Sequence, residues 1–391
     1  MRYRVQPLGQ FIDIISGYAF KSKDFKSTGI PVIKIKNVTP PEVSLVDLSY
    51  IPIEIADSLP KFELSYGDVL IALTGSHINQ MASVVGRVAR VKYYIRSMLN
   101  QRVGKIVVKD KDVCDLEYVY YYLSQDQVKI SLASKAGGAA NQANISPTDV
   151  KELEIPLPPI EIQRRISDIL SAYDDLIENN QKQIKLLEEA AMRLYKEWFV
   201  NLRFPGYKNS KIVDGVPEGW EYKEVGSLIS KTPRTKQVKK SEYNNSGEIP
   251  IIDQSREFIA GYTDDRETIV DLGVPVIVFG DHTRILKLIN FPFAKGADGT
   301  QLIVSGVEEM PQHLLYCSLL NIDLSNYHYA RHFKYLKASK IIVPTKNISE
   351  EFESIVEIYF KVIQILRDKI FLLQKSRDFL LPKLMNGEIE V

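Results

Sequence analysis

The chain has 391 residues, of which 45% are hydrophobic and 25% charged, and its net charge at pH 7 is +1. This length is ample for two domains, and the hydrophobic share suffices for ordinary cores. The two cysteines, Cys114 and Cys317, are far apart in sequence, which argues against a disulfide framework and a cysteine-based zinc site. No stretch reaches the roughly 18 apolar residues of a membrane span, and the start lacks a signal-peptide pattern, so we expect a cytoplasmic protein with no membrane partner.

Landmarks of the first half of the chain recur in the same order in the second half. Leu8-Gly9 with Phe11-Ile12 returns as Val225-Gly226 with Leu228-Ile229, and residues 30–33 return as 249–252; both are predicted to be strands that open a domain. Residues 69–75 (VLIALTG) match 274–280 (VPVIVFG), an apolar strand ending at a glycine. Residues 118–123 match 313–318, and 155–156 match 343–344. Because the offset shrinks along the chain, the second copy is predicted to keep the scaffold and change the loops, where binding surfaces usually lie.

Each copy ends in a long stretch whose apolar positions step by four and three residues, the pattern of a helix with one narrow seam. The spacing of Asn347 and Glu350 predicts a capping pair at the start of the second helix. The first stripe is Ile166, Leu170, Tyr173, Ile177, Asn180, Ile184, Leu187, Ala191, Leu194 and Trp198, and the second is Phe352, Val356, Tyr359, Ile363, Leu366, Ile370, Leu373, Arg377, Leu380 and Leu384.

A narrow stripe favours one partner helix, and the chain supplies one of matching length. The simplest arrangement is an antiparallel pair in which Arg377 lies opposite Tyr173 and Ala191 opposite Tyr359. A cation–π contact and small-against-large packing would then explain the two unusual stripe residues.

The predicted fold is therefore mixed α/β (α+β): two globular domains related by a pseudo-two-fold repeat and separated by two long antiparallel coiled-coil helices. The expected boundaries are 1–155 for the first domain, 156–200 for the central helix, 201–347 for the second domain with a short linker at its start, and 348–391 for the C-terminal helix and tail.

Motifs of catalysis on DNA are missing from the sequence. It has no GxxxxGK[ST] phosphate loop, no glycine-rich cofactor fingerprint, no Asn-Pro-Pro-aromatic tetrad and no Pro-Asp dipeptide. His328 and His332 have helical spacing, but residues 326–336 offer no acidic partner for a metal site. The same segment interleaves Arg331, Lys334 and Lys337 with aromatic residues, which suits contact with phosphates better.

With these residues in view, the chain resembles the specificity subunit of type I restriction-modification systems. Residues 155–166 (IPLPPIEIQRRI) are similar to the family's proline pair followed by Glu-x-Gln-Arg-Arg, and residues 380–389 (LLPKLMNGEI) to its C-terminal signature. Residues 216–220 (VPEGW) resemble the opening of a second target-recognition domain, and residues 16–22 (SGYAFKS) an early motif of the first. The second helix start lacks Gln-Arg-Arg, so its partner contacts need not be equivalent.

The resemblance implies a non-catalytic subunit that reads a bipartite, asymmetric site on double-stranded DNA, with one domain per half-site. It implies two modification (methyltransferase) subunits bound to the paired helices and up to two restriction (ATP-dependent nuclease) subunits outside them. S-adenosylmethionine, ATP and Mg would then belong to those partners, and no cofactor to this chain. The helices would act as a ruler of about 50 Å, on the order of 15 base pairs.

Candidate DNA contacts are amide, hydroxyl, acidic and basic side chains near glycine-marked strand ends, which can bond to base edges or phosphates. In the first domain they are Lys21, Lys23, Thr74, Ser76, His77, Asn79, Gln80, Asn100, Gln101, Arg102, Asn141, Gln142 and Asn144. In the second they are Arg234, Lys236, Asp281, His282, Thr283, Arg284, Lys295, Asp298, Gln301, Arg331 and Lys334.

Two alternatives belong to other functional classes. The first is a stand-alone DNA methyltransferase or nuclease with a recognition domain, against which the missing cofactor and metal motifs count. The second is a coiled-coil adaptor that never binds nucleic acid; the near-neutral charge allows it, but it leaves two domains of shared scaffold and different loops unexplained.

Overall fold

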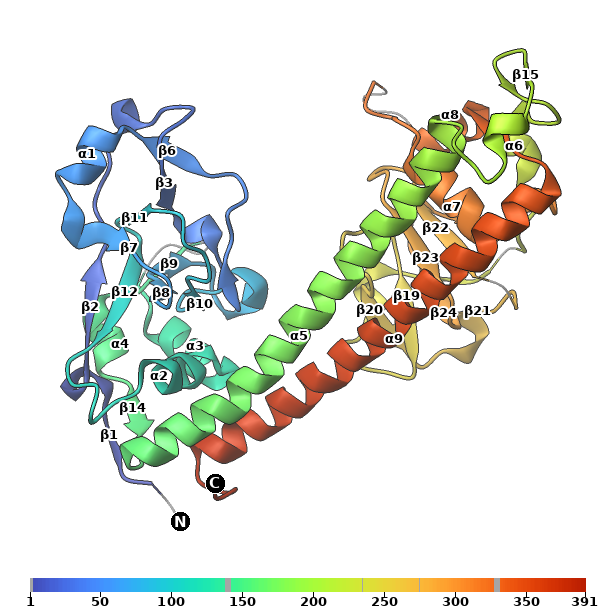
Figure 1. Ribbon diagram of the computed structural model, residues 1–391. Coiled ribbons are helices and arrows are strands. Elements are labelled where there is room, and N and C mark those ends of the chain that lie inside the picture. Colours follow the sequence, from blue (N-terminus) through green and yellow to red (C-terminus); the bar gives the residue numbers. More distant parts are fainter. Residues whose placement is uncertain (1–2, 138–141, 234, 274, 327–330) are drawn as a thin grey trace. The chain divides into compact units, whose positions relative to one another are not determined.

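The computed structural model describes the chain apart from residues 1–2, 138–141, 234, 274 and 327–330 (Figure 1). The chain divides into a first unit of residues 1–177 and 371–391 and a second unit of residues 178–370. The two longest helices, α5 (Ile160–Tyr195) and α9 (Lys346–Met385), each contribute one part to each unit.

The first unit is a mixed α/β structure. Its shorter helices are α1 (Ile53–Asp57), α2 (Leu116–Ser124), α3 (Asp126–Lys135) and α4 (Pro147–Lys151). Its strands are β1 (Val5–Pro7), β2 (Ile12–Ser16), β3 (Ile30–Ile33), β4 (Val38–Thr39), β5 (Glu42–Val43), β6 (Ser49–Ile51), β7 (Glu63–Leu64), β8 (Val69–Ala72), β9 (Thr74–Gly75), β10 (Val88–Arg90), β11 (Ser97–Leu99), β12 (Val103–Val108), β13 (Ala143–Asn144) and β14 (Glu154–Pro156).

A six-stranded sheet of order β2-β12-β8-β10-β5-β4 forms the centre of the first unit, beside a four-stranded sheet of order β6-β3-β11-β7. The apolar strand β8 is buried on both faces. Val69 and Ile71 belong to a core that includes α2 and α5, whereas Leu70 and Ala72 belong to a second core. Because successive strand residues point to opposite faces, a continuous apolar run of this kind is what a strand between two cores requires.

The second unit has helices α6 (Val225–Leu228), α7 (Gln312–Leu320) and α8 (His332–Ala338) besides its parts of α5 and α9. Its strands are β15 (Ile212–Val213), β16 (Val216–Pro217), β17 (Glu221–Glu224), β18 (Gln237–Val238), β19 (Ile249–Ile252), β20 (Gly261–Thr263), β21 (Ile269–Val270), β22 (Val276–Gly280), β23 (Leu286–Ile289), β24 (Phe293–Gly296), β25 (Thr300–Ile303) and β26 (Lys340–Val343).

Strand β22 of the second unit corresponds to β8 of the first, because it too lies between two cores. It lies at the centre of a three-stranded sheet of order β23-β22-β25. Ile277 and Phe279 contribute to one core, and Val276 and Val278 to another. A second sheet has the order β18-β24-β19-β20, with β21 also paired to β24. In both units the apolar strand thus alternates its side chains between two cores.

Of the predicted opening strands, residues 30–33 and 249–252 are confirmed as β3 and β19. The prediction is wrong for Leu8-Gly9 and Val225-Gly226, which lie in helical turns, and strand β2 begins only at Ile12. Residues Leu8–Gln10 form a 3-10 turn, and Val225–Leu228 form α6. A Cβ atom on Gly9 would lie 2.7 Å from Cβ of Lys151, and one on Gly226 would lie 3.2 Å from the carbonyl oxygen of Lys337. The glycines therefore let each turn pack tightly against the end of another helix, while Leu8 and Val225 enter the cores.

None of the twenty stripe residues of the long helices is exposed. In the second unit, Glu188 bonds to Arg367 at 3.0 Å and Trp198 packs on Phe352 with ring centroids 5.7 Å apart. Residue numbers therefore rise along α5 while they fall along α9, so the helices run antiparallel there. Ala191 is fully buried in the same core against which Tyr359 packs.

In the first unit, Arg377 lies opposite Asp174, one residue from its predicted partner Tyr173. Nη1 of Arg377 is 2.6 Å from Oδ1 of Asp174, and Nη2 is 2.8 Å from Asp378. The guanidinium thus meets carboxylates, and the predicted stacking on Tyr173 is wrong. The predicted capping pair is also wrong, because α9 begins at Lys346, which places Asn347 inside the first turn and pairs Glu350 with Lys346.

Within the described part of the chain, none of the helices combines the length and the apolar character that crossing a bilayer requires.

Candidate nucleic-acid interface

The first group of candidate residues follows the buried strand β8. Thr74 is buried, and its hydroxyl donates a hydrogen bond to Oδ1 of Asn144 at 2.8 Å, across the paired strands β9 and β13. The hydroxyl of Ser76 donates to the carbonyl oxygen of Gln80 at 2.8 Å. These bonds fix the loop from inside, and leave the side chains of Gln80, Gln142 and Asn144 exposed, with His77 half-buried.

A second turn lies beside this loop. The carbonyl oxygen of Arg102 accepts a hydrogen bond from the backbone N–H of Leu73 at 3.0 Å, immediately before Thr74. The backbone N–H of Gln101 donates to Tyr18 at 3.0 Å, and a Cβ atom on Gly17 would come within 2.2 Å of the carbonyl oxygen of Asn100. Only glycine permits that approach. Asn100 is buried, whereas Gln101 and Arg102 are exposed beside the first loop.

Lys21 and Lys23 lie in the short turn that follows Tyr18, and both are exposed. The backbone N–H of Lys21 donates to Asp24 at 3.0 Å, which closes the turn. We call the exposed residues of these three segments the first loop cluster: Lys21, Lys23, Gln80, Gln101, Arg102, Gln142 and Asn144. Asn141 and the side chain of Asn79 lie outside what the structure describes.

In the second unit, Gln254 joins two loops that carry candidates. Its Oε1 accepts a hydrogen bond from the backbone N–H of His282 at 3.1 Å, and its Nε2 donates to the carbonyl oxygen of Asp298 at 2.8 Å. The hydroxyl of Thr283 donates to the backbone carbonyl of Gln254 at 2.6 Å. His282, Thr283 and Asp298 are exposed. Gln254 was not predicted, although its position just after the predicted strand 249–252 was a usable signal.

Asp281 is buried and acts as an anchor for α8. Its Oδ1 accepts a hydrogen bond from the backbone N–H of Phe333 at 2.7 Å, and its carbonyl oxygen lies 2.8 Å from Nδ1 of His332. His332 is therefore turned inward, while Arg331 and Lys334 are exposed beside the same loops. His328 lies outside the described residues. Among the described residues, no group of three His, Cys, Asp or Glu side chains could hold a metal ion.

The other candidates of the second unit differ in their surroundings. Nη1 of Arg284 donates to the carbonyl oxygen of Leu324 at 3.0 Å, and Arg284 has a φ of 64°, so it ends the turn in a fixed conformation. Nζ of Lys236 is held by Asp265 at 2.8 Å. Lys295 is half-buried, and burial lowers the pKa of its amine. Gln301 is also half-buried, and Arg234 lies outside the described residues.

We call the exposed residues near Gln254 and Asp281 the second loop cluster: His282, Thr283, Arg284, Asp298, Arg331 and Lys334.

Gln163, from the Glu-x-Gln-Arg-Arg segment, has a structural place in the first unit. Its side chain is fully buried; Oε1 accepts from the backbone N–H of Asp115 at 2.9 Å, and Nε2 donates to the carbonyl oxygens of Val113 and Pro158 at 2.9 and 2.8 Å. Asp115 in turn caps α2 by accepting from the backbone N–H of Tyr118 at 2.8 Å. Gln163 thus fastens the start of α5 to the start of α2.

Comparison with known proteins agrees with this arrangement. A family model described as the type I restriction modification DNA specificity domain matches residues 2–189. The type I restriction enzyme MjaIX specificity subunit of Methanocaldococcus jannaschii is 30% identical over 322 residues, which cover 75% of this chain and 73% of that protein. The putative MjaX specificity subunit of the same organism is 28% identical over 265 residues, which cover 66% of this chain and 60% of that protein.

A solved structure shows the same fold. The type I restriction-modification S subunit from M. genitalium aligns with a TM-score of 0.59 at 16% sequence identity, over 98% of this chain and 96% of that one. Together with the sequence relatives, this places the chain among proteins that recognise DNA sequences. The chain belongs to the specificity subunits of type I restriction-modification systems.

Proposed function

We propose that the chain reads a bipartite, asymmetric site on double-stranded DNA, with the first loop cluster on one half-site and the second on the other. The observation that supports this most is that matching buried strands, β8 and β22, lead into loops with different exposed side chains. Arg102, Gln142 and Asn144 offer one set of donors and acceptors, and His282, Arg331 and Lys334 another. Side chains of these kinds bond to phosphates and to base edges in the major groove.

The long helices would set the distance between the half-sites. Helix α5 has 36 residues and α9 has 40. At about 1.5 Å per residue, each is roughly 54–60 Å long, which corresponds to on the order of 15 base pairs. Because a helix is stiff, such a spacer favours one gap length, and a pair of packed helices is stiffer than a single one.

The methyltransferase partners would bind to a second apolar stripe on α9. Ile358, Ile365, Leu372 and Phe379 recur every seventh residue, and each is more than half exposed. Residues spaced by seven share one face of a helix, and an exposed apolar face of this length is typical of a surface that another helix covers. We call these four residues the outer stripe. It is separate from the inward stripe, whose residues are not exposed.

In this proposal the chain supplies recognition and no chemistry. Two modification subunits with S-adenosylmethionine would transfer the methyl groups, and up to two restriction subunits would use ATP and Mg to cleave. The side chains of both loop clusters suit binding: they are amides, cations, the hydroxyl of Thr283 and the imidazole of His282, with a single carboxylate in Asp298.

A genome-wide map of methylated adenines, made with and without this gene, tests the proposal. The expected result is the loss of one motif with two different half-sites and a fixed gap. Loss of a contiguous palindrome, or no change in methylation while the partner genes are expressed, would contradict it. A purified chain that methylated or cut DNA without partners would contradict the assignment of all chemistry to other subunits.

A further inference from the structure

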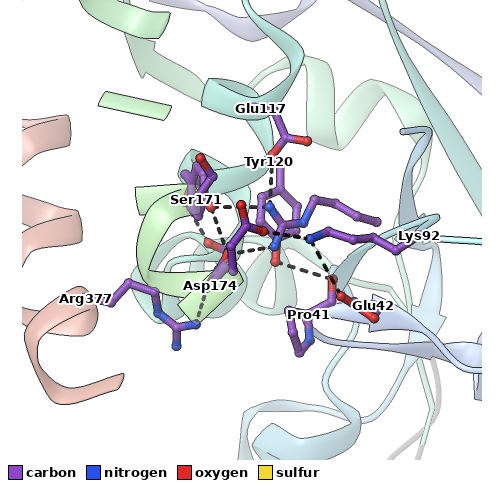
Figure 2. Close-up of polar contacts among 12 residues, drawn as sticks. Pro41, Glu42, Lys92, Glu117, Tyr120, Ser171, Asp174 and Arg377 are labelled. Atoms are coloured by element: carbon purple, nitrogen blue, oxygen red, sulfur yellow. Dashed lines mark hydrogen bonds and ion pairs between the residues drawn. The ribbon is translucent and has the colours of Figure 1, made fainter. Parts of the chain in front are cut away.

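A buried carboxylate in the first unit joins four elements of the chain. Asp174 of α5 accepts from Nη2 of Arg90 in β10 at 2.6 Å, from the hydroxyl of Tyr121 in α2 at 2.8 Å and from Nη1 of Arg377 in α9 at 2.6 Å. Figure 2 shows Arg377 and Glu117 on different sides of Asp174. We call Asp174, Arg90, Glu117, Tyr121 and Arg377 the Asp174 cluster.

Asp174 and Arg90 at the centre of the Asp174 cluster are buried, whereas the side chains of Glu117 and Arg377 are 37% and 23% exposed. The side chain of Asp174 is 5% exposed and that of Arg90 is 3% exposed. Nη1 of Arg90 also bonds to Glu117 at 3.1 Å, and its guanidinium lies 4.3 Å from the centre of the Tyr120 ring. Burial alone would lower the pKa of Arg90, but the neighbouring tyrosines, Glu117 and Asp174 outweigh it and raise that pKa. Removing one partner from such a group is costly, because the remaining charge stays buried without compensation.

The second unit has an aromatic residue at the position that matches Asp174. In the sequence repeat, Tyr121 matches Tyr316 and Asp174 matches Phe360. Tyr316 packs edge-on against Phe360 with ring centroids 5.5 Å apart, and His313 stacks on Phe360 with ring centroids 5.2 Å apart. At this matched position the contact is therefore ionic in the first unit and aromatic in the second, where the carboxylate of Glu353 in α9 bonds to α7 instead. An aromatic contact tolerates small sliding, whereas three short hydrogen bonds to one carboxylate have defined directions.

Hydrogen-bonded strands connect the Asp174 cluster to the first loop cluster. Arg90 pairs with Val69 across the β10–β8 ladder. Strand β8 ends at Ala72 and continues through β9, which contains Thr74, into the loop that carries Gln80. A shift of β10 on α5 would therefore move the loop by a similar amount, because a hydrogen-bonded sheet moves as a body.

We propose that Asp174 is a positioning residue that fixes the first DNA-reading domain on the helix pair and thereby restricts the gap length that the protein accepts. The proposal rests on the proposed function, in which the helices separate two half-sites. One base pair changes the spacing by about 3.4 Å. A first domain that is held rigidly on α5 cannot shift by this distance to reach its half-site, whereas a loosely held domain can.

The test is gap-length discrimination by the methyltransferase complex assembled with the full chain. Methylation rates are measured on duplexes that carry the mapped site with its natural gap, and with one base pair removed or added. Wild-type complex is expected to prefer the natural gap strongly. Asp174→Asn keeps the shape but removes the charge, and is expected to lower that preference by about tenfold, while preference among bases in the second half-site stays unchanged.

Asp175→Asn is the matched control, because Asp175 is the adjacent residue on α5, is exposed and pairs with Lys92 at 3.3 Å on the surface. It is expected to keep the wild-type gap preference. Arg377→Met is a second test variant that removes only the contact from α9 and leaves Arg90 and Tyr121 on Asp174. It is expected to lower gap discrimination in the same direction, and it carries the test if Asp174→Asn does not fold.

Folded Asp174→Asn and Arg377→Met complexes that both discriminate gaps as the wild type does would overturn the role of Asp174 and leave the proposed function standing. A wild-type complex that methylates all three gap lengths equally would instead overturn the spacer function, and this inference with it.

Discussion

Oε1 of Glu353 lies 2.7 Å from Nδ1 of His313 and 3.2 Å from its backbone nitrogen, so a carboxylate of α9 caps the start of α7. Oε2 of Glu353 accepts a second backbone hydrogen bond, from Leu314 at 3.1 Å. In the first unit the matching helix α2 is capped by Asp115, the residue directly before it. Both matching helices are thus capped by a carboxylate, which comes from the preceding residue in the first unit and from α9 in the second.

Glu353→Ala is expected to destabilise the second unit by about 1–2 kcal/mol, because the first N–H groups of α7 lose their acceptor while they remain buried. The measurement is urea unfolding followed by hydrogen exchange of α7. The control is Glu357→Ala, one turn further along α9, whose carboxylate pairs with Lys361 on the surface. A loss of stability no larger than that of the control would show that the cap contributes little.

Gln163→Ala is expected to cost about 2–3 kcal/mol in the first unit, since it leaves two buried carbonyl groups and one N–H group without their partner. Faster hydrogen exchange should appear in α2, whose cap Asp115 is held by Gln163. Gln181→Ala, at an exposed position of the same helix, should leave both stability and exchange unchanged. Equal stability of the two variants would contradict the proposal that the hydrogen bonds of Gln163 hold the start of α5 against the start of α2.

Gln254→Ala is expected to weaken binding to the mapped site by roughly tenfold, because two hydrogen bonds that hold the His282 and Asp298 loops are lost. The effect should fall on the second half-site: mutated bases there should be discriminated less well, and those of the first half-site as before. Gln237→Ala, at an exposed position of β18, serves as control. Weakening spread evenly over both half-sites would contradict this assignment.

Arg102→Ala is expected to reduce the slope of log affinity against log salt concentration by about 1, as the loss of one phosphate contact does. Titrations at several salt concentrations measure it. Arg266→Ala, in which an exposed arginine paired with Glu248 is removed, should keep the wild-type slope. An unchanged slope for Arg102→Ala would place this side chain away from the DNA backbone.

Ile358→Glu combined with Phe379→Glu is expected to abolish co-purification of the methyltransferase subunit, because charges would enter the apolar contact of the outer stripe. The folded chain should persist, since both side chains are exposed in the structure. Gln374→Glu adds a charge at another exposed position of α9 and should leave the complex intact. Normal assembly of the double variant would move the partner surface elsewhere.

The sequence was most informative where physical periodicity is strong. The stripes of α5 and α9 follow directly from apolar residues at steps of four and three, and β8 from an uninterrupted apolar run. The turns at Leu8 and Val225 could not be predicted in the same way, because their packing depends on the close approach of Gly9 and Gly226 to helix ends more than a hundred residues away.

Polar side chains were harder to place. Arg90 and Asp174 are separated by most of the first domain, and in a sequence each looks like a solvated surface charge. Thr74, Asn100 and Asp281 were predicted as candidate DNA contacts from their residue type and their position near glycine-marked strand ends, yet they are buried, and Thr74 and Asp281 hold loops from within. Gln254, which holds two loops, could have been found from its position after a strand.

The ionic junction at Asp174 also constrains how such a protein can evolve by exchanging recognition modules. A foreign first domain grafted onto these helices brings its own residues to the positions of Arg90 and Tyr121. If it brings neither, Asp174 is left as a buried anion with Arg377 as its remaining counter-charge. The grafted protein then loses folding stability, whatever its affinity for DNA. In the second unit the corresponding requirement falls on Glu353, so a foreign second domain must place the start of a helix where its N–H groups reach that carboxylate.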